Sequence, residues 1–128
     1  LIPKKSKIIS TTGYTSRELM QIRTETKNEK GSDFYMVGGM GHTSSVATGY
    51  AMMSNSKVFC LDGDGSMLMH LGSLRTIGFL KKNNLKYIVL NNNSHESVGG
   101  QKTTASGIDF YKLGISLGFK KIFRILKK

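Results

Sequence analysis

The sequence predicts an α/β fold in which a mostly parallel sheet has helices on both faces. Short apolar runs alternate with longer mixed segments along the chain. Each of these runs is followed by a loop rich in Gly, Ser, Thr or Asn. Strands that alternate with helices form βαβ units, whose strands lie parallel. We therefore expect the loops to gather at one edge of the sheet, where such folds bind ligands.

The first two strands are expected in the first third of the chain. Lys7–Ser10 (KIIS) carries two isoleucines, and Asp33–Val37 (DFYMV) carries aromatic and β-branched residues, which are typical of strands. Between them, Thr15 or Ser16 is expected to cap a helix of mixed apolar and charged residues. A glycine-rich loop then leads into a helix of small residues at Ser45–Met53.

Three further strands are expected in the rest of the chain. Lys57–Leu61 (KVFCL) and Lys86–Leu90 (KYIVL) are short apolar runs, and residues 66–81 between them are predicted to form one amphipathic helix. The apolar positions of that helix are Leu68, Leu71, Leu74, Ile77 and Leu80. Beyond a polar loop, the pattern predicts a helix at Phe110–Leu117 and a last strand at Lys120–Leu126 (KKIFRIL).

The composition is that of one globular domain. The chain has 128 residues, of which 38% are hydrophobic and 21% charged, enough for a single core. It contains no run of about 18 apolar residues and no leader peptide, so we expect neither a membrane span nor export. Its one cysteine, Cys60, lies in an apolar run, which favours a buried thiol in a reducing cytoplasm. Leu1 is not a start methionine and the chain stops just after an apolar run, so we expect residues 1–128 to be a fragment.

The chain is strongly basic, with a formal net charge of +11 and a pI near 9.9. Such a charge is compatible with nucleic acids or with small anions as ligands. The lysines form only short clusters, however, and no basic motif interleaved with aromatic residues accompanies them. A solvated basic surface is therefore favoured. A nucleic-acid-associating α/β module is the non-enzyme alternative.

The predicted third strand ends in DGDGS, which places two aspartates among glycines. Asp62, Asp64 and Ser66 have the spacing of the first three ligands of an EF-hand calcium loop. That loop needs glycine at the position of Met67 and glutamate at the position of Ser73. The calcium hypothesis therefore fails.

The same segment resembles the first motif of haloacid dehalogenase-type phosphatases, with Asp62 as nucleophile and Asp64 as acid. Those enzymes also need a later acidic pair to hold magnesium. Downstream of Ser66, the only acidic residues are Glu96 and Asp109, which do not form a pair in the sequence. This hypothesis is therefore disfavoured.

A third hypothesis joins Asp64 to Asn91 and Asn92, which follow the next strand. A right-handed crossover of this length brings the ends of its two strands together. A carboxylate, an amide oxygen and a backbone carbonyl from the loop after Asn92 would then face Mg²⁺, which takes its other ligands from phosphates and water. Gly63 and Gly65 let the backbone approach, and the following helix points N–H groups at an anion. These residues predict a magnesium site that clamps a diphosphate.

The motif GDG at Gly63–Gly65, followed after 25 residues by NN, resembles the thiamine diphosphate motif of the decarboxylase and acetolactate synthase superfamily. The likeness extends to the C-terminal, diphosphate-binding domain of the phosphonopyruvate decarboxylase family. Sulfopyruvate decarboxylases share the glycine loop and GDG. The segments that carry the resemblance are ISTTGYTSREL (9–19), VGGMGHTSSVATGYAM (37–52), CLDGDGSMLMHLGSLRTIG (60–78) and VLNNNSHESVGGQ (89–101).

The resemblance implies three metal ligands, namely Asp64, the side chain of Asn92 and the carbonyl of Ser94. Asn91 is the alternative to Asn92, because the three consecutive asparagines can be aligned with the NN motif in two ways. The family usually has glycine at the position of Asn93, and asparagine tolerates the left-handed backbone angles that glycine adopts. The implied contacts of the cofactor's diphosphate are Thr12, Gly13, Thr15, Gly63, Gly65 and Ser66.

The loop after the second strand resembles the segment that shapes the cofactor. Gly38, beside Gly39, is implied to offer its carbonyl to the pyrimidine amino group, and Met40 to wedge between the two cofactor rings. A pliable apolar side chain suits that wedge. His42 and His95 follow two of the loops and are candidate catalytic residues that meet the substrate or donate protons. A purely structural role stays open for each.

The resemblance implies decarboxylation of a small anionic 2-oxo acid with thiamine diphosphate and Mg²⁺, in the first place of phosphonopyruvate to phosphonoacetaldehyde and CO₂. Sulfopyruvate decarboxylation and an acetolactate synthase-like reaction are the alternatives. Such enzymes take an activating glutamate from a pyrimidine-binding domain, and Glu18, Glu25 and Glu29 are in the wrong part of this domain to supply it. We therefore expect a homo-oligomer in which another domain or subunit completes the site, and an inactive chain by itself.

Overall fold

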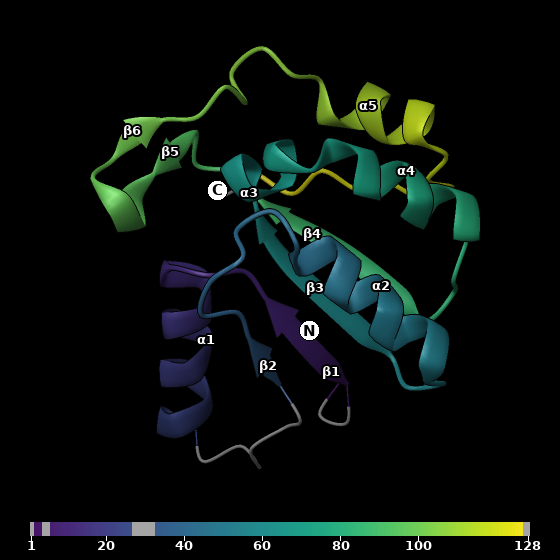
Figure 1. Cartoon of the computed structure of the whole chain (residues 1–128), viewed down its shortest axis with the longest axis horizontal. Helices are drawn as coiled ribbons and strands as arrows, with labels where there is room; N and C mark the ends of the chain where they lie inside the picture. The colour runs from purple at the N-terminus through teal and green to yellow at the C-terminus, as the bar shows by residue number, and fades with distance from the viewer. Residues whose placement is uncertain (1, 4–5, 27–32, 127–128) are drawn as a thin grey trace.

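The computed structural model describes residues 2–3, 6–26 and 33–126. Its centre is a four-stranded parallel sheet in the order β2-β1-β3-β4 (Figure 1). The strands are β1 (Lys7–Ser10), β2 (Phe34–Tyr35), β3 (Val58–Gly63) and β4 (Leu85–Leu90). The predicted parallel sheet is confirmed, although β2 keeps only the middle of the segment expected for it.

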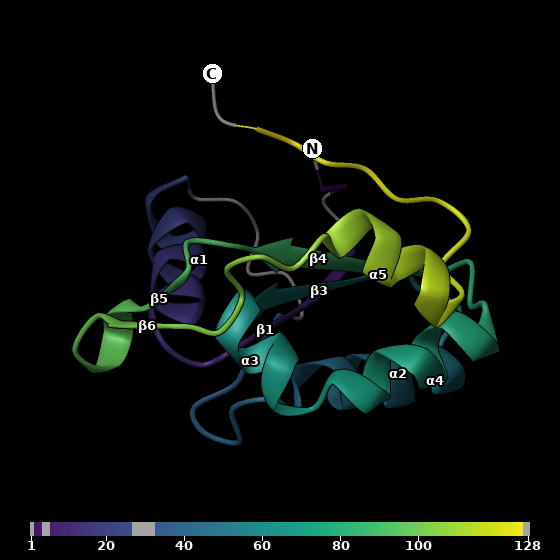
Figure 2. The same cartoon turned by 90° about the horizontal axis from the view of Figure 1, so that it is seen from above.

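Helices lie on both faces of the sheet, as predicted (Figure 2). α1 (Tyr14–Glu25) is on one face, and α2 (Thr43–Met53) and α4 (Leu71–Leu80) are on the other. α3 (Asp64–Met69) begins directly where β3 ends, and α5 (Phe110–Leu117) packs against α4. Within the described ranges, none of the helices has the length and apolar character that a membrane span needs.

The core lies between the sheet and α2. Ile9, Cys60 and Tyr87 occupy equivalent positions on β1, β3 and β4, so their side chains point to the same face. They pack against Ala47 and Ala51, whose small side chains let α2 approach the sheet closely. A second part of the core joins α3, α4 and α5 to β4. It is centred on Met67, Leu74 and Ile77.

The predicted single helix over residues 66–81 is wrong in two respects. The helical stretch begins at Asp64, and it is interrupted at His70, whose φ of −134° and ψ of 51° are not helical. The backbone N–H and the hydroxyl of Ser73 both donate to the His70 carbonyl, at 2.9 and 2.8 Å. The Ser73 hydroxyl also lies 2.6 Å from the Ser44 hydroxyl of α2. These contacts compete with the continuous helix that the apolar pattern favours.

The predicted N-terminal cap of α1 is also wrong. The helix begins at Tyr14 and its N-cap is Gly13, which has a φ of +92° and no side chain to donate or accept. Thr15 and Ser16 therefore lie inside the first turn. Ser16 is buried, and its hydroxyl donates to the Thr11 carbonyl at 2.6 Å, which ties the helix to the end of β1.

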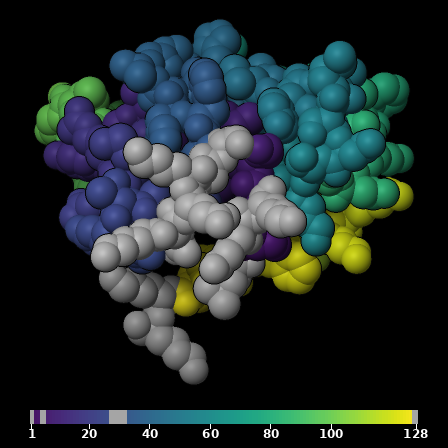
Figure 3. Space-filling model, turned by 90° about the horizontal axis from the view of Figure 1, so that it is seen from below, coloured from purple at the N-terminus to yellow at the C-terminus, as the bar shows by residue number. Residues whose placement is uncertain are grey.

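The last strand, expected at Lys120–Leu126, does not form. This segment has no strand partner, and Phe123, Ile125 and Leu126 are 82%, 91% and 69% exposed. An apolar run becomes a strand only when a neighbouring edge pairs with its backbone groups, and here it runs clear of the sheet (Figure 2). Figure 3 shows the molecule from below, where atoms of the C-terminal part (yellow) and of the N-terminal part (purple) are visible on the same face.

A small antiparallel hairpin replaces the loop that was expected after β4. It consists of β5 (Ser94–His95), the short 3₁₀ helix η1 (Glu96–Val98) and β6 (Gln101–Lys102). Strands of two residues carry little local signal, so nothing in the sequence pattern distinguished them from loop. The hairpin lies beside α3 at the end of the sheet where the strands finish (Figure 1).

Candidate functional site

The loops that follow the parallel strands meet at one end of the sheet, at the upper left of Figure 1. Hydrogen bonds join three of them. The Ser66 hydroxyl, on α3, accepts from the Thr11 hydroxyl at 3.1 Å and from the Gly41 backbone N–H at 3.0 Å. The Thr12 hydroxyl donates to the Val37 carbonyl at 3.1 Å. The loops after β1, β2 and β3 therefore form one connected surface, as the parallel topology predicts.

Asp64 is the acidic residue at the centre of this surface. It follows β3 directly and its side chain is buried, with 2% of the residue exposed. Its carboxylate oxygen Oδ2 accepts a hydrogen bond from the Thr103 hydroxyl, and the Thr103 backbone N–H donates to the Asn93 carbonyl at 3.0 Å. Asp64 is thus connected through a single residue to the asparagine loop after β4.

Asn91 and Asn92 are both exposed and hold the asparagine loop in shape. Their side-chain oxygens accept from the backbone N–H groups of Asn93 and Ser94, each at 3.1 Å. Asn93 has a φ of +57°, so the left-handed geometry expected at this position is confirmed. Because the two amide oxygens make equivalent bonds, the choice between Asn91 and Asn92 as a metal ligand stays a prediction.

The oxygen atoms gathered here suit Mg²⁺, which prefers carboxylate, amide and backbone oxygens. Among the described residues, the carboxylate oxygen Oδ1 of Asp64 accepts no side-chain hydrogen bond, so it is free to face a cation. Across the same part of the chain, no three His, Cys, Asp or Glu side chains gather to hold a metal by themselves. A metal at Asp64 would therefore depend on the amide and carbonyl oxygens of the asparagine loop.

The hairpin lies directly on the glycine loops. A Cβ atom on Gly65 would collide with the His95 ring, whose Nδ1 would be 2.8 Å away, and a Cβ on Gly13 would lie 2.7 Å from the Ser97 hydroxyl. Both glycines thus make room for the hairpin. His95 is half-buried beside Gly65, close to where a diphosphate is expected.

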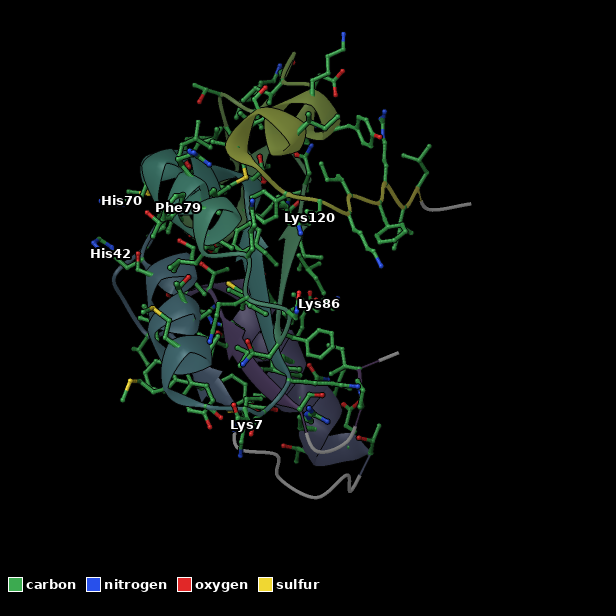
Figure 4. All side chains as sticks on the ribbon, turned by 90° about the vertical axis from the view of Figure 1, so that its right-hand side faces the viewer. Lys7, His42, His70, Phe79, Lys86 and Lys120 are labelled. Carbon is green, nitrogen blue, oxygen red and sulfur yellow. The ribbon has the colours of Figure 1, made fainter. Side chains whose placement is uncertain are left out.

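His42 lies at the start of α2 and is exposed. Its ring centroid is 4.2 Å from that of His70, and Figure 4 shows the two side by side, on the side of the molecule away from Lys86 and Lys120. His70 is not among the predicted site residues, because the apolar pattern places it inside a continuous helix. The pairing arises where that helix is interrupted.

The glycine loop after β2 is largely exposed. Gly38 and Gly39 are exposed, Gly39 has a φ of +64°, and Met40 is half-buried. On the loop after β1, Thr12 and Thr15 are half-buried around Gly13. The predicted contacts of these positions with a cofactor stay predictions.

Asp62, the other aspartate of DGDGS, is part of the support of the site. It is completely buried, and its carboxylate accepts from the Tyr87 hydroxyl at 2.7 Å and from the Gly63 N–H at 3.0 Å. Burial, and next the charge of Asp62, raise the pKa of the Tyr87 hydroxyl above its usual value. Asp62 therefore holds the backbone just before Asp64, a role that the sequence analysis did not assign.

A hollow of about 350 Å³ lies elsewhere, beside β1, β2 and α2. None of the predicted site residues lines it. Its lining residues are Lys7, Ile9, Asp33, Phe34, Val46 and Tyr50. The candidate site is instead identified by the convergence of polar groups at the strand ends.

Comparison with known proteins connects this geometry to a family. The model of the C-terminal TPP binding domain of thiamine pyrophosphate enzymes matches residues 11–125. The chain is 40% identical to a phosphonopyruvate decarboxylase from Streptomyces viridochromogenes, over 94% of the chain and 29% of that protein. It is also 40% identical to the sulfopyruvate decarboxylase subunit beta of Methanocaldococcus jannaschii, over 80% of the chain and 52% of that subunit. The chain thus spans under a third of the first relative and about half of the second.

A solved structure supports the fold. A protein from Mycobacterium smegmatis, whose description reads "putative thiamin diphosphate-dependent enzyme", matches with a TM-score of 0.69 and 21% sequence identity. The match covers 92% of this chain and 23% of the other chain. The arrangement of a parallel sheet between helices is therefore shared with a much longer protein.

Proposed function

This chain belongs to the family of thiamine pyrophosphate enzymes, as their C-terminal TPP binding domain, and we propose that it binds thiamine diphosphate with Mg²⁺ as part of a 2-oxo acid decarboxylase. The observation that carries the proposal is the link from the Asp64 carboxylate through Thr103 to the Asn93 carbonyl. This link supports the convergence of a carboxylate and an asparagine loop at adjacent strand ends, which a metal-bound diphosphate requires.

The proposed metal ligands are Asp64, the Asn92 side chain and the Ser94 carbonyl, with Asn91 as the alternative to Asn92. Only one of these groups is charged, so the ion would keep a net positive charge toward the diphosphate. Mg²⁺ typically uses one or two carboxylates and completes its octahedron with phosphate and water. The oxygen-rich chemistry of these residues fits that ion.

The loops around the metal are proposed to hold the rest of the cofactor. Backbone and hydroxyl groups of Thr12, Gly13, Thr15, Gly63, Gly65 and Ser66 would contact the diphosphate. Gly38 would accept from the pyrimidine amino group through its carbonyl, next to Gly39, and Met40 would support the bent cofactor. The exposed loop after β2 leaves these groups accessible.

The bound thiamine diphosphate supplies the electron sink for the loss of CO₂. The chain's own contribution is to hold the cofactor, to attract the substrate and to place polar groups beside it. His95, half-buried against Gly65, and His42, at the start of α2, are proposed to meet the substrate's charged groups or to donate protons. The formal charge of +11 favours the approach of a multiply anionic substrate.

The substrate is proposed to be phosphonopyruvate, which would yield phosphonoacetaldehyde and CO₂. Sulfopyruvate is the alternative substrate, because a phosphonopyruvate decarboxylase and a sulfopyruvate decarboxylase subunit are each 40% identical to the chain. Both are small 2-oxo acids with a second anionic group. Rates of CO₂ release from the two substrates, measured on the full protein that carries this chain, decide between them.

The chain is proposed to work as one domain of a larger cytoplasmic homo-oligomer. A pyrimidine-binding domain or subunit would supply the activating glutamate. The name of the Methanocaldococcus jannaschii relative, subunit beta, is consistent with a partner chain in that enzyme. The buried, unpaired Cys60 is compatible with a reducing compartment.

Cofactor binding gives the direct test of this proposal. Thiamine diphosphate with Mg²⁺ should raise the melting temperature, because a ligand that binds only the folded state stabilises it. Asp64→Asn, which keeps the shape but removes the charge, should lose the Mg²⁺-dependent part of the shift. Glu18→Gln, at an exposed position of α1, should keep it. A wild-type chain with no shift, or an Asp64→Asn chain with a normal one, contradicts the proposal.

A further inference from the structure

Thr103 and Ala105 are the two buried residues in a connection that is otherwise exposed or half-buried. Thr103 follows β6, and only 7% of it is accessible, whereas Lys102 and Thr104 on either side are exposed. The connection from β6 to α5 passes beside α3 in both views of the fold (Figures 1 and 2). A polar side chain buried at this point needs hydrogen-bond partners, and the Thr103 hydroxyl finds them in the Asp64 carboxylate and the Ala105 backbone N–H.

The hydroxyl of Thr103 has a defined direction. Its oxygen accepts from the Ala105 backbone N–H at 3.4 Å, and its single proton goes to Oδ2 of Asp64. Its methyl group lies against Gly65, where a Cβ atom would be 3.0 Å from it. The side chain is therefore held on three sides and fixes one oxygen of the Asp64 carboxylate.

The backbone of the same residue holds the second loop. The Thr103 N–H donates to the Asn93 carbonyl at 3.0 Å, between the two residues proposed as metal ligands on that loop. One residue thus sets the orientation of the carboxylate and the position of the asparagine loop. A neutral donor on Oδ2 leaves the negative charge in place and leaves Oδ1 for a cation.

We propose that Thr103 is a positioning residue for the metal site and that its hydroxyl raises the affinity of the chain for the divalent ion. The inference rests on the proposed function, because it takes Asp64 and the asparagine loop as ligands. Groups that orient metal ligands in this way typically change metal affinity by about 10–100-fold. Thr103 does not itself touch the metal.

A competing role for the Thr103 hydroxyl would change the metal affinity in the opposite direction. The Thr103 hydroxyl could occupy the place of the metal on Asp64, in which case its removal would strengthen metal binding. A positioning role requires weaker binding when the hydroxyl is lost. The direction of the change in affinity therefore distinguishes the two.

The experiment measures Mn²⁺ binding, as a substitute for Mg²⁺, to the full protein saturated with thiamine diphosphate. The loss of the free-ion EPR signal reports bound Mn²⁺, after subtraction of the ion held by free cofactor. Thr103→Val should weaken binding by about 10–100-fold, and Thr103→Ser, which keeps the hydroxyl, should restore it. Thr104→Val is the matched control at the exposed neighbouring position and should bind as wild type.

Two further measurements keep the result interpretable. Melting temperatures without metal show whether each variant folds. If Thr103→Val does not fold, Thr103→Ala replaces it, and the same weakening of Mn²⁺ binding is expected. Unchanged or tighter Mn²⁺ binding in a folded variant without the hydroxyl overturns the inference. The proposed function still stands in that case if the wild-type protein binds Mn²⁺ with the cofactor. A wild-type protein that binds no Mn²⁺ with the cofactor contradicts the proposed function itself, and the inference with it.

Discussion

Gly65 is confined to glycine by its neighbours. It lies in α3, where its own backbone angles would accept alanine, but the His95 ring and the Thr103 methyl group occupy the space of a Cβ atom. Gly65→Ala should therefore push the hairpin away and reduce the free energy of unfolding by about 1–3 kcal/mol. Denaturation with urea measures the change, and the cofactor-dependent melting shift should fall with it.

Gly49 provides the control for this substitution. It lies inside α2, and a Cβ atom there would meet nothing within 4 Å. Gly49→Ala should leave the protein as stable as wild type or up to about 1 kcal/mol more stable, because alanine loses less backbone entropy in a helix. If both variants behave alike, the packing account of Gly65 is wrong.

Tyr87 and Cys60 should make the fold sensitive to alkaline pH. Burial, with a further contribution from Asp62, raises the pKa of both groups in the folded state. Stability is fully present below the unfolded pKa values, about 8.5 for cysteine and about 10 for tyrosine, and is lost as the pH rises above them. The free energy of unfolding should fall by about 1.4 kcal/mol per pH unit for each group that only the unfolded state ionises.

The Tyr87→Phe variant isolates the contribution of the phenol. It removes the proton that titrates above about pH 10, so the stability curve should become flatter there than in wild type. At pH 7 the variant should be less stable by about 1–3 kcal/mol, because one oxygen of the buried Asp62 loses its donor. Parallel curves for the two proteins above pH 10 would argue against an elevated Tyr87 pKa.

At the scale of elements, the contact between α4 and α5 depends on Gly78. A Cβ atom at this position would collide with the backbone carbonyl of Leu117, whose carbon would be 2.9 Å away. Backbone atoms cannot turn aside as a flexible side chain can, so Gly78→Ala should displace α5 and cost about 1–3 kcal/mol. Thermal unfolding followed by circular dichroism measures the loss.

Gly72 lies on the same helix and serves as the reference position. Its Cβ atom would have nothing within 4 Å, so Gly72→Ala tests the general effect of alanine in α4 without a collision. We expect this variant to match or exceed the wild-type melting temperature. An equal loss of stability in both variants would locate the effect in α4 itself and not in its contact with α5.

At the scale of the whole molecule, one sheet face is only partly covered. On this face α1 contacts β1 and β3, while Leu90 on β4 is 48% exposed and Ile88 is half-buried on the same face. The apolar Phe123, Ile125 and Leu126 are also exposed after α5. Apolar surface of this kind is typical of a protein that contacts another domain or subunit.

The chain by itself should therefore bind the cofactor without turning over substrate. Assays with thiamine diphosphate, Mg²⁺ and either phosphonopyruvate or sulfopyruvate should release no aldehyde product. Activity should appear when a domain or subunit that carries the activating glutamate is present. Turnover by the isolated chain would refute the proposed division of the site between two parts.

The amino-acid sequence by itself determined the parallel sheet, the order of its main elements and the residues at the strand ends. These follow from local properties, because apolar runs, glycine loops and one crossover length place GDG and NN at neighbouring strand ends. The left-handed angle of Asn93 agrees with the resemblance, because the family usually has glycine at this position and asparagine tolerates that angle.

Only the tertiary structure decided how those ends are held. Thr103 contacts Asp64 across 39 positions of sequence. His70 meets His42 at the interruption between α3 and α4. The run KKIFRIL has the pattern of a strand, but it does not pair with either edge strand of the sheet. Such contacts depend on which segments fold beside one another, and no short-range periodicity carries that information.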